Sequence, residues 1–212
     1  MPIALTLLAA CGPSPDAPLA DRLAAAAPGL SREVLDAALG AARCAEARGE
    51  VEGGALAVID YRRPSVTQRM WLLDLDVGSA RSMLVAHGEA TGGLWATAFS
   101  NTPDSHQSSL GLFRGAEVYN GRHGRSLRLD GLEPGFNDQA REREIVVHGA
   151  DYVSYGFILR SGRLGRSWGC PAVPESEVDA VVTALADGGA LFAWGEEEAW
   201  RERSTYLRCE GR

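Results

Sequence analysis

The segment GRLGRSWGCP, residues 162–171, organises the chain around a cysteine that follows a glycine and precedes a proline. Glycine lets the backbone approach a substrate closely, and Pro171 fixes the turn before a predicted helix. This pattern is typical of an exposed, reactive thiol at Cys170. The backbone N–H groups of Gly169 and Cys170 are placed to stabilise the oxyanion of a tetrahedral intermediate.

A thiol is mostly protonated at neutral pH, so a nucleophilic cysteine needs a base. His148 is the best candidate, because it ends the predicted strand 145–148, is followed by Gly149 and precedes Cys170 by one strand-and-loop excursion. The alternatives are a small buried hydrophobic residue for the cysteine and a hydrogen-bonded core residue for the histidine. We predict that Cys170 and His148 form a nucleophile and its base.

The other histidines, His87, His106 and His123, are too widely spaced for a metal motif such as H-E-x-x-H. We therefore expect no metal ion, and nothing in the sequence indicates a cofactor. His87 is expected to make a structural hydrogen bond. The middle of the chain carries arginines that we expect on a solvated loop face, and the alternative is contact with acidic groups of a ligand. They are Arg114, Arg122, Arg125 and Arg128.

The flanking sequence predicts a mainly β fold, a β-rich α+β domain with one helix at its N-terminal side and one after the cysteine. Ser31 is a good N-cap for a helix that runs to about Arg48, with apolar residues at helical spacing. A second helix is expected to start at Pro174 and to end at Gly188-Gly189. Short β-rich runs predict strands at 55–61, 69–76, 79–87, 110–113, 126–129, 145–148 and 190–194, with a hairpin turn at 76–79.

The N-terminus has the form of a bacterial lipoprotein signal. Residues 1–10, MPIALTLLAA, are apolar but too short to span a bilayer, and Cys11 follows directly. We expect residues 1–10 to be a signal peptide, Cys11 to be the lipidated residue, residues 11–30 to be a tether and residues 31–212 to be a single catalytic domain. The protein is then exported to the cell envelope and contacts a membrane only through the lipid anchor. The alternative is a buried N-terminal strand.

Two further cysteines, Cys44 in the predicted first helix and Cys209 near the C-terminus, have two equally favoured states. They form a disulfide in an exported protein, or they are free buried thiols. The 212 residues carry a formal net charge of −7, which argues against a nucleic-acid partner. The acidic run 196–198 is expected to be part of a solvated tail.

Two motifs of the chain resemble the L,D-transpeptidase, or YkuD-like, catalytic domain. That family has a His-Gly strand followed by Ser/Thr-His-Gly-Cys, and here those positions read His148-Gly149 and Ser167-Trp168-Gly169-Cys170. The chain carries Trp168 where the family has histidine, and Pro171-Ala172 where an arginine commonly follows. These motifs and the segments 100–113, 126–133 and 165–172 together resemble a divergent branch of the family, the murein L,D-transpeptidase catalytic domain proteins. The resemblance covers about residues 50–195.

The resemblance implies a β-rich L,D-transpeptidase fold and an acyl transfer on peptidoglycan stem peptides. Cys170 is expected to attack the bond between diaminopimelate and the terminal D-alanine of a tetrapeptide stem, and His148 to move the protons. Ser167 is expected to orient His148 through its hydroxyl or its backbone carbonyl. Trp168, either a lid over the groove or part of the core, and Arg166 are the candidate substrate-binding residues.

The resemblance leaves the acyl acceptor open. An amine of a second stem or of a protein gives a transpeptidase, whereas water gives an L,D-carboxypeptidase with the same cysteine and histidine. The altered motif also allows a peptidoglycan-binding lipoprotein that has lost catalysis.

Overall fold

A computed structural model describes residues 18–209, which contain one eight-stranded sheet and five α-helices. The strand order is β3-β2-β1-β8-β4-β5-β6-β7. The pairs β1–β8 and β6–β7 are parallel, and the other neighbours are antiparallel. The strands are β1 (Ala55–Asp60), β2 (Met70–Asp74), β3 (Ser79–Met83), β4 (Gly111–Gly121), β5 (Gly124–Gly131), β6 (Val146–Gly149), β7 (Ala172–Val173) and β8 (Ala190–Trp194). The helices are α1 (Leu19–Ala26), α2 (Arg32–Ala47), α3 (Tyr155–Ser161), α4 (Val178–Leu185) and α5 (Glu198–Arg203), with a short 3-10 turn at Ala186–Gly188.

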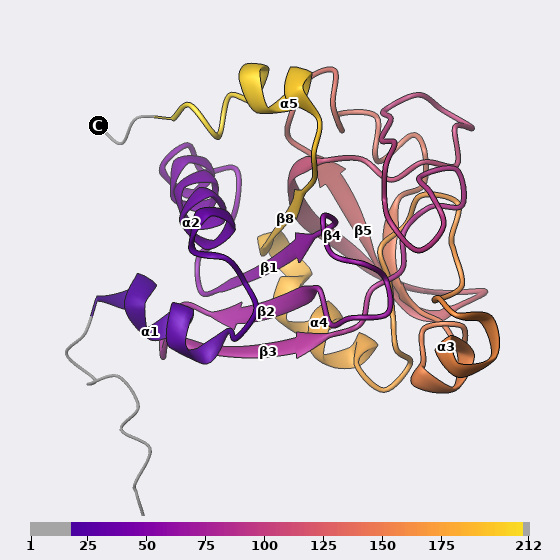
Figure 1. Cartoon of the computed structure of the whole chain (residues 1–212). Helices are drawn as coiled ribbons and strands as arrows, with labels where there is room; N and C mark the ends of the chain where they lie inside the picture. Colours follow the sequence, from indigo (N-terminus) through magenta and orange to yellow (C-terminus); the bar gives the residue numbers. More distant parts are fainter. Residues whose placement is uncertain (1–17, 210–212) are drawn as a thin grey trace, which may run out of the picture.

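The centre of the sheet forms the core. All residues of β8 and all but the first of β1 are buried, as expected for parallel strands that are covered on both faces. Helices α2 and α4 both pack on β1, and α1 and α3 lie at opposite ends of the molecule (Figure 1). The predicted mainly β fold is confirmed.

Helix α2 and the first hairpin follow the sequence pattern. The Ser31 Oγ accepts the Val34 N–H at 3.4 Å, and the apolar stripe of α2 is buried. Strands β2 and β3 pair from Asp74 opposite Ser79, and Gly78 in the turn has a φ of +72°. The predicted N-cap and hairpin are confirmed.

The tether prediction is wrong from residue 19 onward. This stretch forms α1, which packs against β3 and α2 and buries Leu23 completely. Its alanine-rich sequence has high helix propensity, and Leu23 contributes to the same core as the sheet. The folded domain therefore begins before residue 31. The predicted signal peptide and the lipidation site Cys11 lie outside the described residues.

Three other elements differ from the sequence prediction. The second helix begins at Val178 instead of Pro174, because a turn in which the Glu177 N–H donates to the Pro174 O at 2.9 Å comes first. The acidic run begins a helix, α5, since Trp200 is completely buried and anchors it. Helix α3 was not predicted, and none of its residues is buried.

The Cys44–Cys209 disulfide is present, with Cα atoms 6.1 Å apart. It joins α2 to the C-terminal segment across 165 residues. This confirms the first of the two states considered for these cysteines. A cross-link over so long a loop stabilises a fold by about 2–5 kcal/mol.

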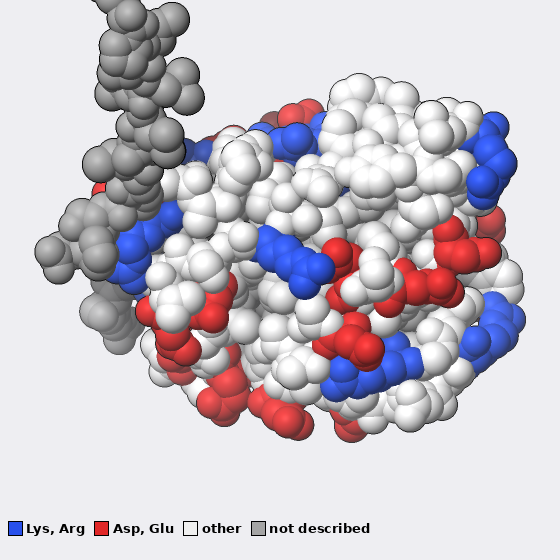
Figure 2. Space-filling model, turned by 90° about the horizontal axis from the view of Figure 1, so that it is seen from below, with Lys and Arg blue, Asp and Glu red and all other residues white. Residues whose placement is uncertain are grey.

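The surface carries both charges close together. In the view from below, acidic and basic side chains lie side by side (Figure 2). Ion pairs such as the one between Arg81 and Glu177, 2.7 Å apart, join separate elements. No helix within residues 18–209 is long and apolar enough to cross a membrane.

Candidate active site

A hollow of about 530 Å³ surrounds Cys170. It is formed by the β4–β5 hairpin, the start of β6 and the cysteine segment. Its walls are Tyr119, Arg122, His123, Arg128, Arg143, Glu144, Val146, His148, Tyr152, Arg166, Ser167, Trp168 and Cys170. The predicted nucleophile, the predicted base and both predicted substrate-binding residues therefore border one hollow. Arg122 and Arg128 border it too, and Arg122 is exposed, as expected from sequence.

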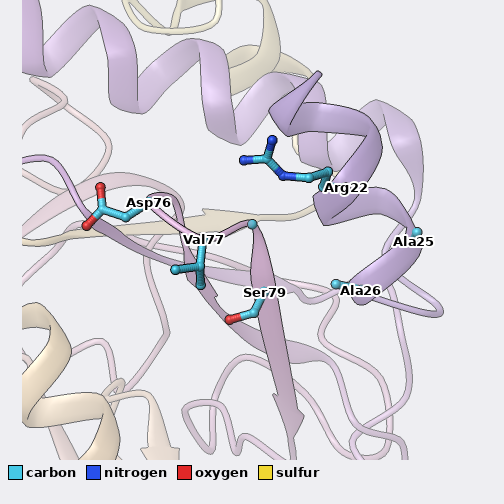
Figure 3. Close-up of a pocket in the computed structure, with 7 residues that line it drawn as sticks. Arg22, Ala25, Ala26, Asp76, Val77 and Ser79 are labelled. Carbon is cyan, nitrogen blue, oxygen red and sulfur yellow. The ribbon is translucent and has the colours of Figure 1, made fainter. Parts of the chain in front are cut away.

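A second hollow, of about 560 Å³, lies between α1 and the β2–β3 turn (Figure 3). Its walls are Arg22, Ala25, Ala26, Asp76, Val77, Gly78 and Ser79. None of these side chains is a nucleophile with a base beside it. The hollow at Cys170 is therefore the better candidate for a reaction site.

The pairing of β6 with β7 brings the cysteine segment alongside the strand that carries His148. His148 pairs with Ala172 and Gly149 with Val173. Two residues earlier, Cys170 comes beside Val146, whose N–H donates to the Cys170 Sγ at 3.4 Å. Cys170 therefore lies just before β7, beside the strand that carries His148, and both residues border the hollow.

His148 is in a protonation state suited to a base. The ring is 3% exposed, and its Nδ1 lies 3.0 Å from the Gly149 O. A carbonyl accepts only, so Nδ1 carries the proton and Nε2 is left as the basic nitrogen. Burial lowers the pKa of His148 below 6.5, and the nearby His123 and Arg122 lower it further. The ring is therefore neutral at pH 7.

The Cys170 thiol rests in its protonated form. Burial raises its pKa above 9, whereas the Val146 N–H and the charge of Arg143 act in the opposite direction. The Sγ donates to the Glu144 O at 3.7 Å, and Glu144 has a backbone φ of +54°. Among the described residues no hydrogen bond joins Cys170 to His148. Catalytic hydrogen bonds are often long before substrate binds, and the dyad stays a prediction.

Ser167 holds the turn before Cys170 and does not orient His148, so that expectation is wrong. Its Oγ donates to the Cys170 O at 2.6 Å and accepts the Gly169 N–H at 3.2 Å. Both hydrogen bonds of the hydroxyl go to backbone groups of its own turn, and the Ser167 O accepts the Glu89 N–H at 2.8 Å. The Gly169 N–H is thereby occupied, which leaves the Cys170 N–H as the candidate oxyanion donor of this pair.

The backbone conformation at position 169 and a close contact with a neighbouring carbonyl require glycine there. Its φ is +120°, and a Cβ there would lie 2.8 Å from the Gln107 O. Only glycine accommodates both the conformation and the contact without strain. The residue therefore serves the shape of the cysteine turn.

Trp168 lies on the rim of the hollow. Its side chain is 67% exposed, which excludes the core position considered from sequence. The indole stacks on His106 with ring centroids 4.8 Å apart, and the His106 Nδ1 lies 2.8 Å from the Glu89 Oε1. The Arg166 Nη1 donates to the carbonyls of Glu89 and Gly92 at 3.1 and 3.2 Å. Both predicted substrate-binding residues are thus held at the edge of the site.

His87 is structural, as expected from sequence. It is 1% exposed, and the buried Arg69 donates through Nη2 to its Nδ1 at 2.7 Å. Burial and the charge of Arg69 lower the pKa of His87 to about 4. The His87 O accepts the Ser167 N–H at 3.0 Å. Arg69 and His87 therefore help to hold the turn that precedes Cys170.

Two neighbours of Cys170 and His148 were not predicted from the sequence. The His123 ring, in the β4–β5 turn, lies 4.4 Å from the His148 ring between centroids. Arg143 borders the hollow beside Cys170 and bonds to the segment 100–109. Both contacts join residues far apart in the chain, which no local motif reports. Within residues 18–209, no three His, Cys, Asp or Glu side chains are grouped to hold a metal ion.

A family model described as the L,D-transpeptidase catalytic domain matches residues 26–194. The match includes β1 to β8 and every wall of the hollow at Cys170. No curated protein matches the chain.

Several solved structures are similar to the chain. An L,D-transpeptidase from Mycobacterium smegmatis is 13% identical, with 67% of this chain and 59% of that chain covered and a TM-score of 0.43. The helical cell shape determining protein Pgp2 from Campylobacter jejuni is 12% identical, with 68% and 48% covered and a TM-score of 0.40. An L,D-transpeptidase from Xylanimonas cellulosilytica is 17% identical, with 72% and 68% covered and a TM-score of 0.37. The chain spans less than two thirds of the length of the first two.

Proposed function

Because the chain belongs to the L,D-transpeptidase catalytic domain family, we propose that it performs acyl transfer on peptidoglycan stem peptides, with Cys170 as nucleophile and His148 as base. One observation carries the proposal. A thiol and a neutral, buried imidazole border the same hollow, and the thiol lies against Val146 of β6, the strand that carries the imidazole.

The proposed reaction begins with transfer of the Cys170 proton to the His148 Nε2. The thiolate attacks the carbonyl carbon between diaminopimelate and D-alanine, and the Cys170 N–H stabilises the oxyanion. The C–N bond breaks, D-alanine leaves with the proton from His148, and a thioester remains on Cys170. The acceptor then gives a proton to His148 and attacks the thioester, which releases the acyl group and restores the thiol.

The charge around the hollow suits a substrate that carries carboxylates. Four arginines border it, and Glu144 is its only acidic residue. Arginine binds carboxylates through paired N–H groups, and a tetrapeptide stem carries several carboxylates. The arginines are Arg122, Arg128, Arg143 and Arg166.

We also propose that the protein is exported to the cell envelope. Its substrate lies there, and the Cys44–Cys209 disulfide is of a kind that persists in oxidising compartments. Attachment through a lipid on Cys11 remains part of this proposal.

The test is incubation of the mature protein with purified tetrapeptide muropeptides, with and without an amine acceptor, followed by mass spectrometry. Crosslinked product identifies a transpeptidase, and tripeptide alone identifies an L,D-carboxypeptidase. Cys170→Ala and His148→Gln should abolish either product. Arg141→Gln, a change of an exposed arginine outside the hollow, should leave it unchanged. Absence of both products and of an acyl adduct on Cys170 would overturn the proposal in favour of a binding protein.

A further inference from the structure

Arg143 is a half-buried arginine whose guanidinium is fixed by four neutral acceptors. Its Nη1 donates to the Ser100 O at 2.7 Å and to the Ser109 Oγ at 2.6 Å. Its Nη2 donates to the Ser105 Oγ at 3.2 Å and to the Gln107 O at 2.5 Å. Among the described residues, no carboxylate lies within ion-pair distance of it. A half-buried cation without an anion beside it is costly unless something else supplies negative charge.

Cys170 is the group beside Arg143 that can supply that charge. Both residues border the same hollow, and the Arg143 Nη2 lies 3.3 Å from the position of a Cβ at Gly169, the residue before the cysteine. The two charges stabilise each other, since Arg143 lowers the pKa of the thiol and the thiolate raises the pKa of the guanidinium.

We propose that Arg143 is a positioning residue that acts through Cys170, holding a fixed positive charge beside the sulfur so that the thiolate forms more readily. The proposal rests on the proposed role of Cys170 as nucleophile. In this proposal the segment 100–109 has a role at the site, because it supplies the acceptors that keep the guanidinium in place.

Other groups around the thiol come from several elements, and the Val146 N–H, which donates to the Sγ, lowers the pKa of the thiol more than Arg143 does. Glu144 raises the pKa of the thiol. Arg122 and Arg166 are exposed, so solvent and salt screen them. The titratable or charged groups that face the hollow are Tyr119, Arg122, His123 and Arg128 of the hairpin, Arg143 and Glu144 before β6, His148 of β6, Tyr152 after it, and Arg166 of the cysteine segment. Tyr61, after β1, approaches from the core side.

The test is the pH dependence of alkylation by iodoacetamide, measured on the Cys170 peptide by mass spectrometry. An opposite charge at close range lowers a pKa by about 1–3 units. Arg143→Gln, which keeps donors but loses charge, should therefore move the alkylation midpoint up by about one to two pH units. Arg143→Lys, which keeps the charge, should stay within about 0.5 unit of the unchanged protein.

Ser109→Ala distinguishes the effect of the Arg143 charge from the effect of the hydrogen bonds that hold its side chain. It removes one acceptor of Arg143, so the melting temperature should fall while the midpoint stays unchanged. An unchanged midpoint in Arg143→Gln would overturn the proposal. If Arg143→Gln does not fold, Arg143→Lys decides alone, and a rise of a full unit or more in that variant would overturn it. Alkylation needs no muropeptide, so this result is independent of whether turnover is found.

Discussion

Gly169→Ala tests the geometry of the cysteine turn. Alanine at a φ of +120° costs on the order of 1–3 kcal/mol. The new Cβ would also lie 2.8 Å from the Gln107 O, and that carbonyl cannot retreat easily because it accepts from the Arg143 Nη2 at 2.5 Å. We expect a loss of roughly 2–4 kcal/mol in the free energy of unfolding.

Gly162→Ala is the matched control. Gly162 ends α3 with a φ of +69° in the same segment, and no heavy atom lies within 4 Å of its Cβ position. Only the backbone term applies, so this variant should lose about 1 kcal/mol. The difference between the two variants isolates the contact with Gln107.

Urea denaturation and thermal melting measure both losses. A domain of this length loses roughly 2–4 °C per kcal/mol, so Gly169→Ala should melt about 5–15 °C lower and Gly162→Ala about 2–4 °C lower. The rate of Cys170 alkylation should change in Gly169→Ala and stay unchanged in Gly162→Ala, because only the first substitution displaces the residue next to the sulfur. Equal stability of the two variants would refute the assigned role of the turn.

Three more predictions follow from other contacts. Cys44→Ser should lower the free energy of unfolding by about 2–5 kcal/mol in urea, and equal stability with the unchanged protein would show that the bond to Cys209 does not persist in solution. Because burial lowers the pKa of His148, the acid limb of the pH profile of kcat/KM should be centred below the ordinary histidine pKa of about 6.5. An acid limb centred above 6.5 would contradict that environment. Trp200→Phe removes the N–H that donates to the Glu133 Oε2 at 3.1 Å and should cost about 1–3 kcal/mol, read as a lower melting temperature.

Local patterns predicted the elements that bury a regular set of side chains. Strands β1 and β8 are continuous apolar runs, and α2 has both a cap and an apolar stripe. Strands β4 and β5 were predicted too short, as 110–113 and 126–129. Their outer halves form a hairpin with exposed side chains, so the alternation that identifies a half-buried strand is missing there.

The residues of the candidate site also divide into those that a local motif predicts and those that only the folded chain brings together. Cys170 and His148 were predicted because each lies in a local motif with a glycine. Ser167 was assigned to the wrong partner, since a motif gives the order of residues and not the direction in which a hydroxyl points. Arg143 bonds to residues 34 to 43 positions earlier in the chain, and only the folded chain brings them together.

In the proposed mechanism, the resting site favours the neutral pair. Burial raises the pKa of Cys170 and lowers that of His148, so proton transfer between them creates two charges where burial opposes both. The Val146 N–H and Arg143 offset part of this cost at the sulfur. At His148 the Gly149 carbonyl stabilises the protonated ring, while His123 and Arg122 oppose it. A carboxylate-bearing substrate that neutralises Arg122 would remove the part of that opposition that comes from Arg122, so binding of the correct substrate would itself favour the ion pair that begins the reaction.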